Sequence, residues 1–266
     1  MKRALAPATL YTQLQPFIAP TKADIKKFKN PTTPQAKALA WLQTDPVANA
    51  PGLDLQSIIE RYVLAVFDFS TCGTYSACPD QTGIPTCDWS RVTCSDTEPR
   101  TIVDFSRNPS ANGIALPWEL SLLTNLVSLS LEDSWWGGTI PTQFGKLTKL
   151  TSLNLDYNQF IGGIPDSLSL LTQLAELKMS ESGVSGKIPK SLAKLTKLET
   201  LTLSDNKLVG VVPNELGLLT SLTELSLSTN KLLGPLPIGL CNLVSLQQLK
   251  LQNNMIGGTI PNCGVG

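Results

Sequence analysis

The stretch LTKLTSLNLDYNQFIGGIPDSLSLLTQL, residues 147–174, begins and ends with the same pair of leucines three residues apart. Aligned on itself, the chain repeats every 24 residues in the pattern L-x-x-L-x-L-x-x-N/S-x-φ-x-G-x-φ-P, where φ is an apolar residue. Six copies begin at Leu126, Leu150, Leu174, Leu198, Leu222 and Leu246. A period of this length, held without a gap, predicts a solenoid built from stacked coils.

Each column of the repeat has a structural reason. The L-x-L core alternates at period two, which predicts a short strand with inward-pointing leucines. Glycine permits a tight or positive-φ bend, and the step before proline favours extended backbone. The Asn or Ser column can bond backbone groups of the turn and form a polar ladder through the stack. That column comprises Ser134, Asn158, Ser182, Asn206, Asn230 and Asn254.

The amino-acid composition limits the kinds of binding and catalysis that the chain can support. Twenty-one basic residues balance 21 acidic ones, so no overall field attracts nucleic acid or an anionic membrane. The chain has no histidine, which removes the commonest general base and metal ligand, and it has no Walker-type loop or G-x-S-x-G elbow. These observations predict a non-enzymatic protein without metal or cofactor. No 18-residue apolar run is present, so a membrane anchor would lie outside this chain.

The segment before the repeats is predicted to cap the solenoid, whose ends would otherwise expose apolar surface. TPQAKALAWLQTDP (33–46) and LDLQSIIERYVLAVFDFSTCG (53–73) each carry apolar residues at helical spacing. Residues 1–30 contain lysines and prolines without clear periodicity and are predicted to be a flexible tether. The expected domains are therefore the tether, a cap at 31–100, and about seven repeats at 101–266.

The first repeat is expected to be irregular. In TIVDFSRNPSANGIALPWEL (101–120), Val103, Phe105 and Asn108 fit the strand and turn positions if two extra residues precede Leu116 and Pro117.

The repeat resembles the plant-type leucine-rich repeat, which occurs in receptor ectodomains and in inhibitors of cell-wall-degrading enzymes. The resemblance covers 101–266 and implies an α/β solenoid: a right-handed superhelix with a parallel β-sheet on its concave face and a helical, disulfide-bonded amino-terminal cap. CDWSRVTC (87–94) resembles the C-x-W-x-x-V-x-C signature of such caps. Together with TPQAKALAWL and RYVLA, it is most similar to the algal, diatom-type branch over 31–98.

The six cysteines are predicted to form three disulfides. The cap signature implies Cys87–Cys94, which leaves Cys72 to pair with Cys78. Cys241 and Cys263 lie almost one period apart and should fall on neighbouring coils within crosslinking distance. Paired cysteines predict an oxidising, extracellular or cell-surface location, although no signal peptide is visible and no N-x-S/T sequon occurs.

The candidate ligand surface is formed by the residues that flank the inward leucines. With strands about 4.8 Å apart, six strands offer a concave strip on the order of 25–30 Å long. Its first half is acidic and aromatic, and its second half is small, polar and mildly basic. The predicted ligand-binding residues are Glu132, Asp133, Trp135, Asp156, Tyr157, Glu176, Lys178, Glu181, Asp205 and Lys207.

Trp135 is the residue singled out on this strip. Trp136 occupies the apolar column of Phe160 and Val184 and is predicted to be buried. Trp135 shares the solvent-facing column of Gln159 and Gly183, so it is a candidate binding residue if it does not simply cover its neighbour.

Four functions can be compared. The resemblance favours a recognition module for a protein, peptide or glycan, acting as a monomer or a ligand-induced dimer. A secreted inhibitor of a glycan-degrading enzyme would use the same strip. Ice binding would require a regular Ser/Thr array, which Lys, Glu and Tyr interrupt. Carboxylate pairs such as Asp133 and Asp156 can hydrolyse glycosides in a cleft, but an open strip provides no enclosure.

Overall fold

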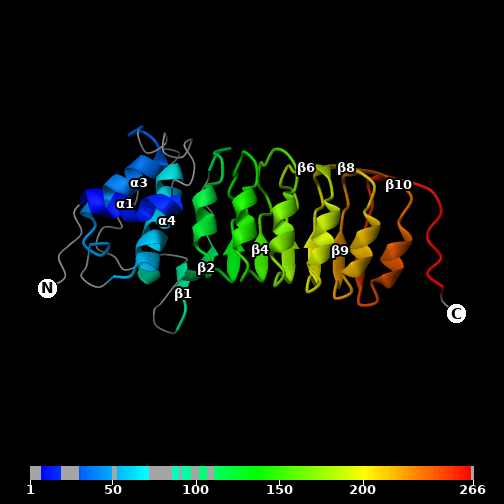
Figure 1. The fold of residues 1–266 in the computed structure, drawn as a ribbon. Coiled ribbons are helices and arrows are strands. Elements are labelled where there is room, and N and C mark those ends of the chain that lie inside the picture. The colour runs from blue at the N-terminus through cyan, green and yellow to red at the C-terminus, as the bar shows by residue number, and fades with distance from the viewer. Residues whose placement is uncertain are drawn as a thin grey trace.

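The computed structural model describes residues 7–18, 30–49, 53–71, 86–89, 92–96, 102–106 and 111–264. Figure 1 shows an elongated stack, with helices at the amino-terminal end followed by coils that succeed one another toward the carboxyl terminus. Neighbouring coils are neighbours in sequence, as the 24-residue period predicts.

The main sheet runs the length of the stack in the order β1-β2-β3-β4-β5-β7-β9-β11. β1 is antiparallel to β2, and each later pair is parallel. Leu129 aligns with Leu153, and Leu153 with Leu177, so the register advances by one repeat at each strand. The strands are Val92–Cys94 (β1), Ile102–Ser106 (β2), Ser128–Ser130 (β3), Ser152–Asn154 (β4), Glu176–Lys178 (β5), Thr200–Thr202 (β7), Glu224–Ser226 (β9) and Gln248–Lys250 (β11).

Two further layers complete the coils. A second parallel sheet contains β6 (Ser185–Lys187), β8 (Lys207–Gly210), β10 (Lys231–Gly234) and β12 (Met255–Ile256). Short 3-10 helices follow the proline of every repeat but the last. The prolines are extended as predicted, for example with φ −63° and ψ 127° at Pro141, but the prediction of no helix at this step is wrong, since a helical turn begins at the next residue. These helices are η2 (Trp118–Leu122), η3 (Thr142–Lys146), η4 (Asp166–Leu170), η5 (Lys190–Lys194), η6 (Asn214–Leu218) and η7 (Ile238–Asn242).

The predicted polar ladder is present inside the stack. Asn158 Oδ1 accepts a hydrogen bond from the Trp136 backbone N–H at 2.8 Å, and Asn158 Nδ2 donates to three backbone carbonyls. The shorter Ser182 side chain cannot reproduce this, and the Phe160 N–H bonds to the Ser182 backbone oxygen instead. The ladder satisfies backbone groups that the curved coil leaves without a strand partner.

The cap closes the first coil. α3 (Pro34–Thr44) and α4 (Leu55–Thr71) match the two predicted helices, and the Thr33 hydroxyl caps α3 by accepting from the Ala36 N–H. Phe67 of α4 contacts Phe105 and Trp136, with ring centroids 5.0 and 5.1 Å apart. These contacts join the helical cap to the repeat core.

A buried ion pair holds the cap together. The Arg61 Nε donates to Asp45 Oδ2 at 2.6 Å, and both side chains are fully buried. The Arg61 guanidinium also lies 5.3 and 5.5 Å from the ring centroids of Trp41 and Trp89. Trp89 follows η1 (Thr86–Asp88), so this cluster joins the helices to the cysteine-containing segment.

The structure corrects two predictions for the amino-terminal region. Residues 1–30 were expected to be a tether, but Pro7–Ile18 form helix α1, in which Leu14 and Ile18 are buried. The apolar residues four apart pack on the cap although Pro16 lies inside the helix. In the irregular repeat the predicted register is wrong by two residues. Phe105 aligns with Leu129 rather than with Leu131, and Ile102 rather than Val103 is buried with it. Asn108 lies outside the described residues.

Two predicted disulfides are present. Cys87 and Cys94 bond within the cap, and Cys241 and Cys263 join the last coils with Cα atoms 5.1 Å apart. The predicted pair Cys72–Cys78 lies outside the described residues.

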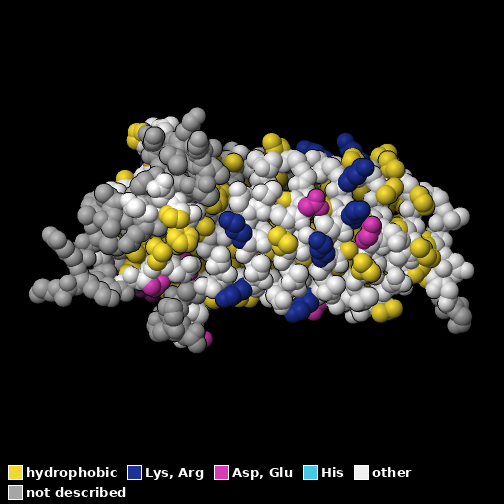
Figure 2. Space-filling view, viewed as in Figure 1, with side chains coloured by type: hydrophobic (Ala, Val, Ile, Leu, Met, Phe, Trp, Pro, Cys, Tyr) yellow, Lys and Arg dark blue, Asp and Glu magenta, His cyan; other side chains and the backbone are white. Residues whose placement is uncertain are grey.

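The carboxyl-terminal end of the stack is less covered than the middle. Leu249 is 44% exposed, whereas its counterparts in β3 to β9 are buried. Figure 2 shows hydrophobic side chains gathered toward this end and lysines spread over the middle coils. Within the described part of the chain, none of the helices has the length and apolar character needed to cross a membrane.

Candidate ligand-binding face

The outer face of the main sheet, here called the concave face, is bordered by a column of left-handed residues. One residue per coil has positive φ directly before the Asn or Ser column, including Asp133 (49°), Tyr157 (55°) and Glu181 (51°). This conformation costs a residue other than glycine roughly 1 kcal/mol or more. Hydrogen bonds between coils hold it, such as Tyr157 N–H to the Ser180 carbonyl at 2.9 Å. The backbone therefore fixes the direction in which these side chains leave the coil.

Two large aromatic side chains are exposed beside this column. Trp135 is 51% exposed and also has a positive φ of 58°, and Tyr157 is 46% exposed. Trp136 is fully buried, so the predicted division between the two tryptophans is confirmed. Trp135 is anchored through its backbone oxygen, which accepts from the Gly113 N–H at 2.7 Å. Exposed aromatic rings on a fixed backbone are typical of binding surfaces.

Hydrogen bonds within the concave face fix several carboxylates. Glu132 Oε2 accepts from Asn154 Nδ2 at 3.0 Å, and Asp156 Oδ1 accepts from the Ser180 backbone N–H. Glu176 accepts from Ser152 Oγ at 2.7 Å and forms an ion pair with Lys178. The structure thus brings together Glu132, Asp156, Glu176 and Lys178 from three adjacent coils.

The acidic environment is visible in the pKa shifts. Burial raises the pKa of Asp156 to about 6, and the nearby Glu132 and Glu176 carboxylates add to this effect. The Glu181 carboxylate is the main cause of a raised pKa at Tyr157. The hydrogen bond to Glu176 raises the pKa of Lys178, which is the cation within this group. Although burial opposes it, the hydrogen bond from Lys178 lowers the pKa of Glu176.

The second half of the concave face, formed by the later coils, carries short serine side chains. Ser204, Ser226 and Ser228 are buried, with hydroxyl oxygens 2.6 Å apart between Ser204 and Ser226 and 2.9 Å apart between Ser228 and Ser204. Lys250 is paired with Glu224 at 2.9 Å. The basic character predicted for this half is therefore partly neutralised.

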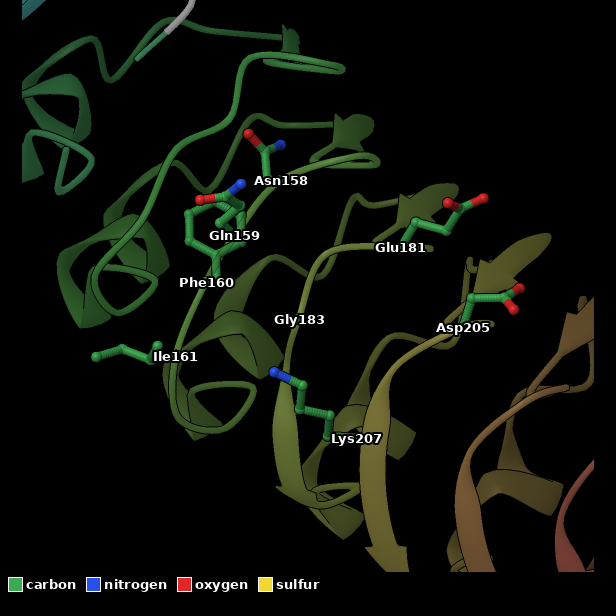
Figure 3. A pocket seen from close by; sticks show the side chains of 8 residues that line it. All are labelled: Asn158, Gln159, Phe160, Ile161, Glu181, Gly183, Asp205 and Lys207. Carbon is green, nitrogen blue, oxygen red and sulfur yellow. The ribbon is translucent and has the colours of Figure 1, made fainter. Parts of the chain in front are cut away.

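A hollow of about 510 Å³ lies at the edge of the concave face (Figure 3). Gly183, which lines it, has no side chain where Trp135, Gln159 and Lys207 have one in the same column. A Cβ on Gly183 would lie 2.7 Å from the Phe160 backbone oxygen, and its φ is 77°. The hollow is lined by Asn158, Gln159, Phe160, Ile161, Glu181, Gly183, Asp205 and Lys207.

Three predicted site residues, Glu181, Asp205 and Lys207, meet at this hollow. In Figure 3 the Lys207 side chain extends toward Gly183, whereas the carboxylates of Glu181 and Asp205 point away from it. The sequence prediction missed Gln159, Phe160, Ile161 and Gly183. The glycine in an otherwise side-chain-bearing column was the available signal.

The predicted carboxylate pair Asp133 and Asp156 does not form an enclosed site. The Asp133 backbone N–H donates to the Asp156 backbone oxygen at 3.0 Å, and neither residue lines the hollow. Asp133 is exposed on the rim of the face.

Comparison with known proteins agrees with this architecture. Family models described as leucine-rich repeat match residues 186–232 and 149–171. The structure of a pollen receptor kinase 3 is similar to this chain with a TM-score of 0.57 and 30% identity, covering 67% of this chain and 86% of that one. This chain belongs to the plant-type leucine-rich-repeat family.

Other solved leucine-rich-repeat structures are longer. The Arabidopsis receptor kinase HAESA, solved with the peptide hormone IDA and the co-receptor SERK1, has a TM-score of 0.67 and 32% identity over 79% of this chain. PEPR1, solved with AtPEP1, has a TM-score of 0.61 and 34% identity over 66% of this chain. This leucine-rich-repeat chain spans 35% of the former and 24% of the latter. None of the curated proteins matches it in sequence.

Proposed function

We propose that this leucine-rich-repeat protein is a non-catalytic recognition module that binds an extended peptide or protein segment along its concave face. The observation that carries the proposal is the pair Trp135 and Tyr157, which are about half exposed on backbone held in the left-handed conformation. Because the backbone is already ordered, binding requires less conformational entropy loss than it would on a flexible loop.

The surrounding residues support a ligand that lies across several coils. The carboxylates of the first half are held by neighbouring coils, and the short serines of the second half are buried and hydrogen-bonded to one another. The similar structure of HAESA, which was solved with the peptide hormone IDA, supports the same class of ligand. The two disulfides support a location outside the reducing interior of the cell.

The test is peptide selection on the oxidised, full-length protein. Displayed random peptides of about twelve residues are selected on the wild type and then on the double variant Trp135→Ala/Tyr157→Ala. We expect peptides that bind the wild type and lose most affinity on the double variant, because interface aromatics carry a large share of binding energy. Leu170→Ala, which alters an exposed residue of η4, is the matched control.

Two outcomes would count against the proposal. Peptides that bind all three proteins equally would place the site elsewhere. Absence of any selected peptide, together with tight binding to a secreted glycan hydrolase, would favour the enzyme-inhibitor alternative. Circular dichroism and the melting temperature of each variant show whether the fold is retained.

A further inference from the structure

We propose that the ligand presents an arginine or lysine side chain against the exposed ring of Tyr157, beside the carboxylates of Glu132, Asp156 and Glu181. This inference rests on the proposed recognition function and specifies the chemistry of its ligand as a cationic polypeptide segment. In the described part of the chain, no other element packs against the concave face around Tyr157.

The ring of Tyr157 is available for stacking. It is 46% exposed, and its backbone is fixed at a φ of 55° by the bond from its N–H to the Ser180 carbonyl. A cation over an aromatic face is attracted by the negative charge of the π system. Trp135, one coil earlier and 51% exposed, offers a second ring of the same kind.

The charge around this ring is unbalanced. Four carboxylates on three coils, those of Glu132, Asp156, Glu176 and Glu181, accompany the ammonium group of Lys178, which is paired with Glu176, and Lys207 lies at the hollow beside Glu181. The raised pKa values of Tyr157 and Asp156 have these carboxylates among their causes. A cationic ligand group would relieve the repulsion among them, whereas a neutral sugar would not.

The hollow beside Glu181 determines where the cation lies. Ile161 is 64% exposed and gives apolar surface for a methylene chain, and Gly183 has no side chain that would occupy this space. Lys207 extends into the hollow and would repel a second cation there. Glu181 and Asp205 point to the opposite side, so the charged end of the ligand is placed by Tyr157 and Glu181 rather than beside Lys207.

This placement makes it possible to distinguish binding of a cationic peptide at Glu181 from its general attraction to a negatively charged surface. Removal of the Glu181 charge should weaken binding of a cationic peptide. Removal of the Lys207 charge should leave such binding unchanged or strengthen it. Glu215, an exposed acid of η6, provides a control for the loss of one negative charge elsewhere on the protein.

The experiment uses the selected peptides described above and reads their composition. We expect arginine and lysine to be enriched over the starting library among peptides that depend on Trp135 and Tyr157. For one such peptide, Glu181→Gln should weaken binding about three- to tenfold, whereas Glu215→Gln and Lys207→Gln should not weaken it. Replacing the key arginine of that peptide by glutamine should remove the effect of Glu181→Gln.

The outcomes distinguish this inference from the proposed function. Peptides that depend on the two aromatic residues but show no enrichment in basic residues would overturn the cation inference and leave the recognition function standing. Basic peptides whose affinity is insensitive to Glu181→Gln and Tyr157→Ala would also overturn it, because their attraction would be general. Preferential binding of a neutral oligosaccharide would do the same. Failure to select any peptide that depends on the concave face would overturn both.

Discussion

Asn158 Oδ1 on one coil accepts a hydrogen bond at 2.8 Å from the backbone N–H of Trp136 on the preceding coil. The same side chain donates to the carbonyl oxygens of Leu131, Leu155 and Asp156. A single amide therefore fixes the turn directly behind Trp135 and Tyr157. The internal Asn ladder of the solenoid therefore also holds the backbone of the candidate binding face.

We expect Asn158→Ala to lower the free energy of unfolding by about 2–4 kcal/mol, because it leaves several buried backbone groups without partners. Asn158→Ser should cost less, since Ser182 occupies the same column and bonds the Leu155 carbonyl through its hydroxyl. Urea unfolding of both variants measures the difference. Equal losses of less than 0.5 kcal/mol would show that the ladder contributes little.

Glu60 is a buried carboxyl group whose protonation should couple to stability. It is 2% exposed, and burial raises its pKa to about 7, although its carboxylate accepts bonds from Gln56 and the Ile102 N–H. Because the folded-state pKa is above the unfolded value, the native protein binds more protons between about pH 4.5 and 7. Stability should therefore decrease as the pH rises through this window.

Glu60→Gln should remove this dependence and retain an acceptor for the Ile102 N–H. Its advantage over the wild type should grow with pH and reach up to roughly 3 kcal/mol at pH 8. Chemical unfolding at pH 5, 6, 7 and 8 measures it. A constant difference between the two proteins at all four pH values would contradict the prediction.

The disulfide Cys241–Cys263 should stabilise the last coils more than the middle of the stack. It closes a 22-residue separation at an end where Val244 and Ile260 are 85% and 84% exposed. Cys241→Ser/Cys263→Ser should cost up to about 3 kcal/mol of local stability. Hydrogen exchange should accelerate in η7, β11 and β12 but not in β4 or β5. Uniform acceleration along the chain would indicate global rather than local unfolding.

Binding of a cationic peptide should depend on Asp156. Because its folded-state pKa is about 6, lowering the pH from 7.5 to 5 protonates it and removes one negative charge from the concave face. The affinity should fall over this interval. Asp156→Asn should bind more weakly at pH 7.5 and lose most of the pH dependence. An unchanged pH profile in this variant would assign the titration to another group.

Much of the fold follows from the sequence because the repeat is periodic. The leucine columns, the Asn ladder and the burial of Trp136 beside an exposed Trp135 depend on one coil and its neighbours, so a 24-residue pattern is sufficient to predict them. Helix α1 was missed because its packing depends on contact of Leu14 and Ile18 with the cap, which has no repeat to reveal it.

The candidate site was predicted only in part. Alternation along the strands identifies Glu132, Asp156 and Glu176 as facing outward, and the structure brings them together. The left-handed backbone of Tyr157 and Glu181 was not predictable from their side chains, since hydrogen bonds between coils impose it on whichever residue occurs there. The hollow is lined in part by Gly183, which has no side chain and is therefore not found by a search for functional groups.

The central claim is that Glu181 and Tyr157 receive a cationic side chain of a peptide ligand. A double-mutant cycle tests it most directly, combining Glu181→Gln in the protein with arginine→glutamine in a selected peptide and measuring all four affinities by calorimetry. We expect a favourable coupling energy of about 0.5–1 kcal/mol or more that weakens as salt is added. Additive effects of the two changes, with no coupling at low salt, would contradict it.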